Sequence, residues 1–138
     1  MKTAPAPTPD MIAAVLRHRL AEHERQESQA RLTWARTTLL PMIKALAPGV
    51  LQRVLVFGSS GSGSAAAHSD IDVLITAEAV DGWDQYERLQ WGARVRAATD
   101  RRYAVDILLY APAEIRDRDG ACARFLDRAL REGVTLLP

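Results

Sequence analysis

The sequence predicts an α/β fold of the α+β kind, in which a small β-sheet is flanked by helices and an additional helical segment precedes it. Apolar runs at 54–57, 71–75 and 103–110 have the length and composition of buried strands. Apolar residues at helical spacing mark the segments before and between these runs. The 138 residues, 48% of them hydrophobic and 25% charged, are enough for one compact core.

The start of the chain is predicted to be a tail followed by a helix. Residues 1–9 are rich in proline and alanine and are expected to be disordered, and Thr8 with Pro9 is typical of a helix start. We expect an N-terminal helix over 10–31, and its large apolar residues all lie in its first half: Met11, Ile12, Val15, Leu16 and Leu20. This helix exceeds what a minimal domain needs, so it either packs on the sheet or docks a partner.

A glycine-serine turn and two acids follow the first predicted strand. The run 54–57 is followed by Gly58 and Ser59, Asp70 comes directly before the next run, 71–75, and Asp72 is the second residue of that run. Side chains in a strand alternate between faces, so both carboxylates should project from one face. Because close carboxylates repel each other unless a cation neutralises them, the pair predicts a divalent metal site. A solvated strand edge and a flexible turn are the alternative explanation.

A third carboxylate, Asp106, is the only charge in the predicted strand 103–110. Burial of an unpaired charge costs several kcal/mol, so this side chain needs a partner. One alternative is a salt bridge to Arg101 or Arg102. The favoured one is a shared site with the two earlier acids, which would give a cage of three carboxylates.

Helical spacing predicts further helices at 32–46, 81–100, 112–117 and 121–132. Pro41 should kink the first of these or break it in two. In the second, Arg88, Arg94 and Arg96 would lie on one side and either meet RNA phosphates or form a solvated face, which is favoured. Gly133 should end the last helix, and a short strand at 134–137 follows it.

The segment from Val54 to Ile75 resembles the signature of the minimal nucleotidyltransferases, the smallest members of the DNA polymerase beta-like superfamily. Their pattern is Gly-Ser, ten residues and Asp-any-Asp, which Gly58, Ser59, Asp70 and Asp72 match without a gap. Gly63 matches the second glycine of the turn, Asp106 the third carboxylate, and 125–134 the closing helix, glycine and strand. The resemblance covers 32–138 and implies a nucleotidyltransferase fold with a small mixed sheet. Serines at 60 and 62 replace two arginines that the family commonly has in this turn.

The resemblance implies a site for ATP, as the substrate, and for two Mg²⁺ ions. Asp70, Asp72 and Asp106 would be the metal ligands and the catalytic residues. The residues implied in nucleotide binding belong to the turn and to the position before the acids: Gly58, Ser59, Ser60, Gly63 and Ser69. An acceptor hydroxyl would attack the α-phosphate in line with the departing pyrophosphate.

Stand-alone proteins of this kind resemble the antitoxins of HEPN/MNT toxin–antitoxin pairs. The resemblance therefore implies AMPylation, the transfer of AMP from ATP to a tyrosine of a HEPN-type ribonuclease toxin. A tRNA-directed enzyme, an antibiotic-modifying enzyme and a non-catalytic binding antitoxin remain alternatives. RNA is a possible partner but is not favoured.

Composition and charge exclude several other classes. The net charge of +1 provides no global field for nucleic acid or an anionic membrane. No apolar leader follows Met1, so we expect no signal peptide, no membrane span and a cytoplasmic location. Cys122 is the single cysteine, which rules out an internal disulfide.

Overall fold

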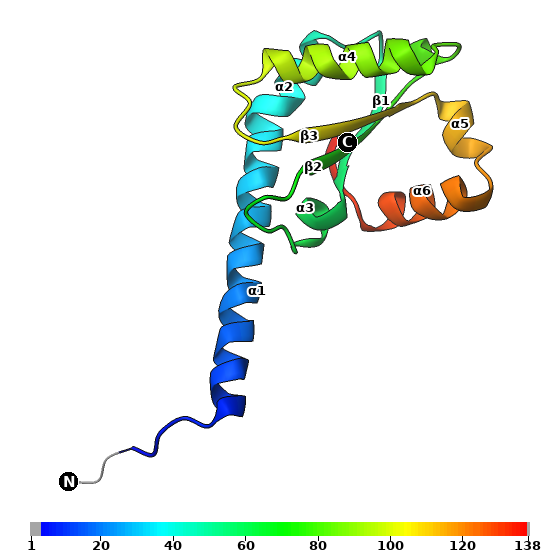
Figure 1. Ribbon diagram of the computed structural model, residues 1–138. Helices are drawn as coiled ribbons and strands as arrows, with labels where there is room; N and C mark the ends of the chain where they lie inside the picture. Colours follow the sequence, from blue (N-terminus) through cyan, green and yellow to red (C-terminus); the bar gives the residue numbers. More distant parts are fainter. Residues whose placement is uncertain (1–3, 138) are drawn as a thin grey trace.

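Four strands form one mixed sheet at the centre of the structure, a computed structural model that describes residues 4–137. The strands are β1 (Leu51–Phe57), β2 (Ile71–Ala77), β3 (Val105–Tyr110) and β4 (Val134–Leu137), in the spatial order β3-β2-β1-β4. β1 is antiparallel to β2 and β4, whereas β2 and β3 are parallel (Figure 1). The prediction of a small mixed sheet flanked by helices is therefore confirmed.

One long helical run precedes the sheet. Helix α1 (Pro9–Trp34) is capped by Thr8, whose side-chain oxygen accepts a hydrogen bond from the Met11 N–H at 3.2 Å. A π-helical turn (Ala35–Leu39) and α2 (Leu40–Ala45) continue it without a break. The predicted irregularity at Pro41 therefore takes the form of this turn, because a proline early in α2 has no N–H for a regular ladder. Residues 4–8 lie outside any helix or strand, and the rest of the predicted tail, 1–3, lies outside the described residues.

The sheet is covered on both faces. The alternating residues Ile71, Val73 and Ile75 of β2 are fully buried against the inner end of the helical run, α2 and α4. Leu74 points to the other face and packs with Leu126 of α6. The predicted alternation in this strand is thus confirmed. The strand order places β1 and β2 in the middle of the sheet, and both strands contribute side chains to the cores on its two faces.

The remaining helices follow the sequence closely, with one correction. They are α3 (Gly58–Ser62), α4 (Gln85–Ala98), α5 (Pro112–Arg116) and α6 (Gly120–Glu132), with a 3₁₀ turn at Glu78–Val80. The predicted helix 81–100 begins later than expected, because Asp84 caps α4 by accepting from the Glu87 N–H at 2.8 Å. Its buried side chains are Trp91 and Val95, whereas Tyr86 and Leu89 are exposed.

The two halves of α1 have different surroundings. The outer half (residues 9–21) extends away from the sheet and its helices, as Figure 1 shows. Its large apolar side chains are 47–58% exposed: Met11, Ile12, Val15, Leu16 and Leu20. The inner half (residues 22–34) packs on the domain and buries Ser28, Arg31 and Trp34. No helix among residues 4–137 is long and apolar enough to span a bilayer.

Candidate functional site

The end of β1 brings a glycine against a carboxylate. Phe57, the last residue of β1, is paired with Asp72 of β2, and Gly58 follows with φ +67°. A Cβ at Gly58 would lie 2.5 Å from Oδ2 of Asp72. Glycine at this position therefore serves two needs, because it adopts a left-handed conformation and leaves room for the carboxylate beside the backbone.

Two of the predicted acids lie directly opposite each other. Asp72 and Asp106 are register partners on the parallel strands β2 and β3, so their side chains leave the same face of the sheet. Asp70 lies one residue before β2 and is exposed, which corrects the prediction that it is a strand residue. Burial raises the pKa of Asp72, and the negative charges of Asp106 and Asp70 raise it further.

The surroundings of Asp106 differ from those predicted. Its side chain is exposed, although the strand was expected to bury it. Within residues 4–137, the ion pairs do not include one between Asp106 and Arg101 or Arg102. The alternative of a salt bridge is therefore wrong. The neighbour of Asp106 on the adjacent strand is another carboxylate, that of Asp72.

The donor chemistry of this cluster suits a hard divalent cation. Carboxylate oxygens are the ligands that Mg²⁺ prefers. Burial is the main cause of the raised pKa of Asp72, and the repulsion from Asp106 and Asp70 that adds to it is the kind that a cation relieves. In the part of the chain that the structure describes, however, no three acidic, histidine or cysteine side chains are gathered tightly enough to enclose a metal ion. The three acids are neighbours at one edge and do not form a closed cage.

A cavity of about 350 Å³ opens beside Asp72. Its lining comes from the end of β1, from the turn and from α6: Phe57, Gly58, Ser59, Ser62, Ser64, Asp72, Phe125, Arg128, Ala129 and Glu132. Of the residues predicted to bind nucleotide or metal, Gly58, Ser59 and Asp72 face this cavity. Ser60, Gly63, Ser69, Asp70 and Asp106 are not among its lining residues.

Three of the residues predicted to bind nucleotide, Ser60, Gly63 and Ser69, belong to the framework of the turn and its loop and do not line the cavity. Ser60 is completely buried, and its hydroxyl has no hydrogen-bond partner among residues 4–137. Gly63 ends α3 in the left-handed conformation, with φ +84°. The hydroxyl oxygen of Ser69 accepts a hydrogen bond from the Ala66 N–H at 2.9 Å, which closes the loop before Asp70. These three residues shape the turn, whereas Gly58 and Ser59 line the cavity.

Two cavity residues from α6 were not foreseen from the sequence. Phe125 stacks edge-on against Phe57 with the ring centroids 5.5 Å apart, and it is 44% exposed. Arg128 lies one turn further along and donates from Nε to Glu132 at 3.1 Å. An arginine in a chain this rich in arginine carries no signal of its own, and only the packing of α6 against the end of β1 brings it near Asp72.

The predicted basic face of α4 is weaker than expected. Arg88 is mostly buried and donates to the carbonyl oxygens of Val80 and Leu109 at 3.3 and 3.1 Å, and it pairs with Glu114 at 2.7 Å. This arginine therefore holds α4 to β3 and α5. Because the Arg88 side chain is mostly buried, it is not available for phosphate contacts, which weakens the case for a basic track along this helix.

Comparisons with known proteins identify the family and the fold. The sequence profile of the nucleotidyltransferase domain family matches residues 38–131. No curated protein matches the chain. A candidate nucleotidyltransferase from Sulfolobus solfataricus is 23% identical in sequence, with a TM-score of 0.53 over 81% of this chain and 85% of that one. A toxin–antitoxin structure with AMP-PNP is 20% identical, with a TM-score of 0.55 over 74% of this chain and 72% of that one.

These two structures share the fold. The profile match spans more than half of the 138 residues and includes β1, the turn, β2, β3 and α6, which are the elements that build the cavity and position the three acids. The chain belongs to the nucleotidyltransferase domain family.

Proposed function

We propose that this chain is a Mg²⁺-dependent protein adenylyltransferase that acts as an antitoxin. It transfers AMP from ATP to a tyrosine of a HEPN-type ribonuclease toxin. The observation that carries the enzymatic part is the Asp72 carboxylate, which lies against Gly58 at the wall of the cavity and in register with Asp106. A site of this kind suits a triphosphate, because the carboxylates that would hold the metal ion lie next to the turn that would hold the phosphates.

The turn and α6 would hold the nucleotide. Gly58 and Ser59 offer a close backbone approach and a hydroxyl to the phosphates, and Gly63 and Ser69 keep the turn in shape. Arg128 faces the same cavity and is exposed, so its guanidinium, which pairs with Glu132, would offer its remaining N–H groups to the phosphates in place of the arginines that serines 60 and 62 replace. The exposed ring of Phe125 offers an apolar surface for the base.

The three carboxylates would bind the metal, and one of them would also accept a proton. Asp70, Asp72 and Asp106 would hold Mg²⁺, which neutralises the triphosphate and lowers the pKa of the acceptor hydroxyl when it is bound. The acceptor oxygen forms a bond to the α-phosphorus, and the bond from that phosphorus to the bridging oxygen breaks, so that pyrophosphate leaves. The hydroxyl proton passes to the exposed carboxylate of Asp106 and from there to solvent.

The outer half of α1 would dock the acceptor protein. Its exposed apolar side chains form one broad stripe, so this surface suits a protein that can cover it. Two arginines, Arg17 and Arg19, outnumber Asp10 on this segment, which favours an acceptor surface with acidic groups beside its apolar patch. The likeness of the fold to one component of a toxin–antitoxin structure with AMP-PNP supports a toxin as the partner.

The alternatives place the acceptor elsewhere. A tRNA-directed enzyme would need a basic track, and the burial of Arg88 counts against it. A small-molecule enzyme would need an acceptor pocket of its own beside the cavity. A non-catalytic antitoxin would keep the fold and the docking helix without transferring a nucleotide.

The experiment is incubation of the chain with ATP, Mg²⁺ and a purified HEPN-type ribonuclease, followed by intact-mass and peptide mass spectrometry. We expect a gain of about 329 Da on one tyrosine, the mass of AMP linked with loss of water in this two-metal chemistry. The Asp72→Asn variant is the matched control, because it keeps the side-chain volume and removes the charge. A modified RNA, or an unmodified ribonuclease that is nevertheless inhibited, would replace this proposal with one of the alternatives.

A further inference from the structure

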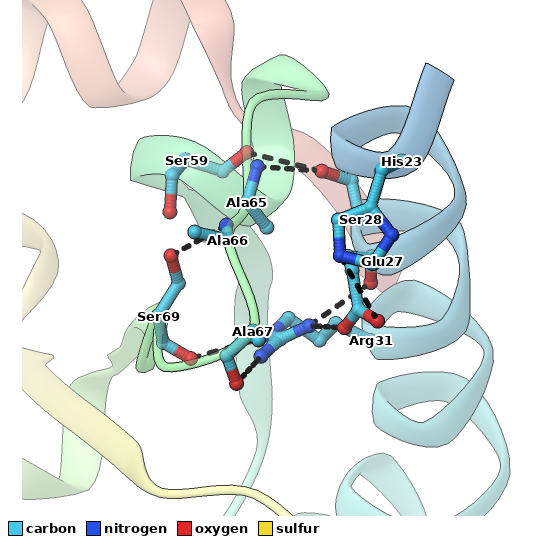
Figure 2. Close-up of polar contacts among 9 residues, drawn as sticks. All are labelled: His23, Glu27, Ser28, Arg31, Ser59, Ala65, Ala66, Ala67 and Ser69. Carbon is cyan, nitrogen blue, oxygen red and sulfur yellow. Dashed lines mark hydrogen bonds and ion pairs between the residues drawn. The ribbon is translucent and has the colours of Figure 1, made fainter. Parts of the chain in front are cut away.

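The inner half of α1 lies beside the nucleotide turn, although it is outside the segment that matches the nucleotidyltransferase family. Figure 2 shows two of its side chains pointing into the segment 59–69. Ser28 is 2% exposed and Arg31 is 1% exposed, in a stretch that is otherwise polar and largely accessible. Burial of these two polar side chains requires partners, and all the turn atoms that they contact belong to the backbone.

Ser28 connects the two sides of the turn. Its hydroxyl oxygen accepts a hydrogen bond from the Ala65 N–H at 2.9 Å and lies 3.5 Å from the Ser59 carbonyl oxygen, to which it donates. The Ser64 N–H also donates to that carbonyl, at 2.9 Å. One buried hydroxyl therefore ties the residue that faces the cavity, Ser59, to the loop that returns toward β2.

Arg31 holds the rest of that loop. Its Nη2 donates to the Ala67 carbonyl oxygen at 3.0 Å and its Nε to the Ser69 carbonyl oxygen at 3.2 Å. Its Nη1 pairs with the carboxylate of Glu27, and the guanidinium lies 4.8 Å from the ring centroid of Tyr103. The planar fork of an arginine reaches two carbonyl oxygens and one carboxylate at once, which the point charge of a lysine does not do.

These contacts replace the secondary structure that the loop lacks. Residues 64–70 belong to no helix or strand, yet they connect the turn to β2 and end at Asp70. Backbone carbonyl oxygens of such a loop are usually satisfied by water, which permits many conformations. Here one buried guanidinium binds the carbonyl oxygens of Ala67 and Ser69, in the loop that ends at Asp70.

We infer that Ser28 and Arg31 are positioning residues, which fix the segment 59–69 so that Ser59 and Asp70 are held in place for the nucleotide. The role in catalysis rests on the proposed nucleotide transfer, whereas the clamp on the loop does not. Because the outer and inner halves are one continuous helix, an acceptor bound to the outer half is oriented relative to the nucleotide site by the same two residues.

The test compares Ser28→Ala, Arg31→Met and Arg31→Lys with Trp91→Phe. Trp91 is 3% exposed and donates to the Leu46 carbonyl oxygen at 2.7 Å, so its variant also loses a buried hydrogen bond, but one far from the turn. Amide hydrogen exchange of residues 64–69, the Kd of AMP-PNP and the KM and kcat for ATP are measured for each chain. Thermal melting shows how much stability each variant has lost.

We expect exchange of the Ala65 amide to be about 5- to 30-fold faster in Ser28→Ala, the effect of one lost hydrogen bond. Arg31→Met should weaken AMP-PNP binding and raise the KM for ATP by a similar factor. Arg31→Lys should regain part of the lost Tm, because it keeps a charge beside Glu27, but it should not regain AMP-PNP affinity. Trp91→Phe should lower Tm and leave both the exchange of the loop and AMP-PNP affinity unchanged.

Two results would overturn the inference. One is unchanged loop exchange in Ser28→Ala and Arg31→Met, which would mean that the loop is held by something else. The other is faster exchange with unchanged AMP-PNP affinity and unchanged KM, which would make the clamp merely structural. Absence of transfer by the wild-type chain, with AMP-PNP binding that still responds to Arg31→Met, would reject the proposed reaction and keep the positioning role.

Discussion

The two halves of α1 reverse what their compositions suggest. The outer half carries most of the large apolar side chains and leaves them exposed, whereas the mostly polar inner half packs on the domain and buries Ser28, Arg31 and Trp34. In an ordinary amphipathic helix the apolar stripe faces the core. Only the inner half packs against the domain. The exposed stripe of the outer half is therefore available to the protein acceptor that we propose it docks.

The comparison also separates two kinds of contact. Contacts of the inner half are directional hydrogen bonds to named backbone atoms, and they fix a loop in one shape. The outer half offers apolar area without such constraints, which suits recognition of a separate surface. Substitutions that damage chemistry, binding and stability should accordingly map to different parts of the chain.

The largest effect is expected where the acids meet. Asp72→Ala should lower the rate of AMP transfer by about a thousand-fold, because it removes a metal-binding carboxylate whose interaction is worth several kcal/mol in the transition state. Asp106→Ala should act in the same direction. Initial rates of label transfer measure the effect, and circular dichroism should show an intact fold. Near-normal rates in both variants would refute the proposed role of these carboxylates.

The second prediction concerns the glycine beside Asp72. Gly58→Ala should lower activity by about a hundred-fold or more, since the new Cβ would meet the Asp72 carboxylate at 2.5 Å. Gly63→Ala is the matched control, because Gly63 also has a positive φ but nothing lies within 4 Å of its Cβ position. Equal losses in the two variants would show that backbone strain, and not displacement of the carboxylate, explains the effect.

The third prediction tests the outer half directly. Leu16→Glu combined with Leu20→Glu should raise the KM for the protein acceptor by about tenfold, through loss of a docking contact, and leave the KM for ATP unchanged. Both residues are 58% exposed, so Tm should stay within about 1 °C of the wild type. Steady-state kinetics with each substrate varied in turn measure the split. A parallel rise in both KM values would show that the outer half acts on the nucleotide site instead.

The smallest effect concerns stability without metal. The raised pKa of Asp72 means that the folded state favours the protonated carboxyl, so folding stability falls as pH rises through that pKa. Asp72→Asn removes this penalty and should raise Tm by a few degrees near pH 7 in EDTA. The gain should disappear below the ordinary value of 3.8, where the wild-type carboxyl is protonated in both states. A gain that does not depend on pH would point to packing as its cause.

The sequence is informative about this protein where the chemistry is local. Alternation in β2, the cap at Thr8 and the Gly58-Ser59 turn follow from short patterns, and the structure confirms each of them. The pairing of Asp72 with Asp106 depends on strand order, which periodicity did not predict; a shared site was expected only from the cost of burying Asp106 alone and from the resemblance.

Other features of the site depend on tertiary packing. Arg31 and Arg128 resemble the many other arginines of the chain, and only the approach of α1 and α6 to the turn distinguishes them. Arg88 shows the converse, because an arginine expected on a helix surface is largely buried and holds three elements together. A long charged side chain can be bound by carbonyl oxygens that no sequence pattern marks.

The measurement that tests the central claim most directly is the stoichiometry of inhibition. The chain is mixed with its ribonuclease partner at about one part in a hundred, with ATP and Mg²⁺, and both ribonuclease activity and partner mass are followed with time. A catalyst regenerates after each transfer, so the account predicts complete loss of ribonuclease activity together with the AMP adduct on every partner molecule. Inhibition that appears only near one-to-one, with or without ATP and equally in Asp72→Ala, would contradict it.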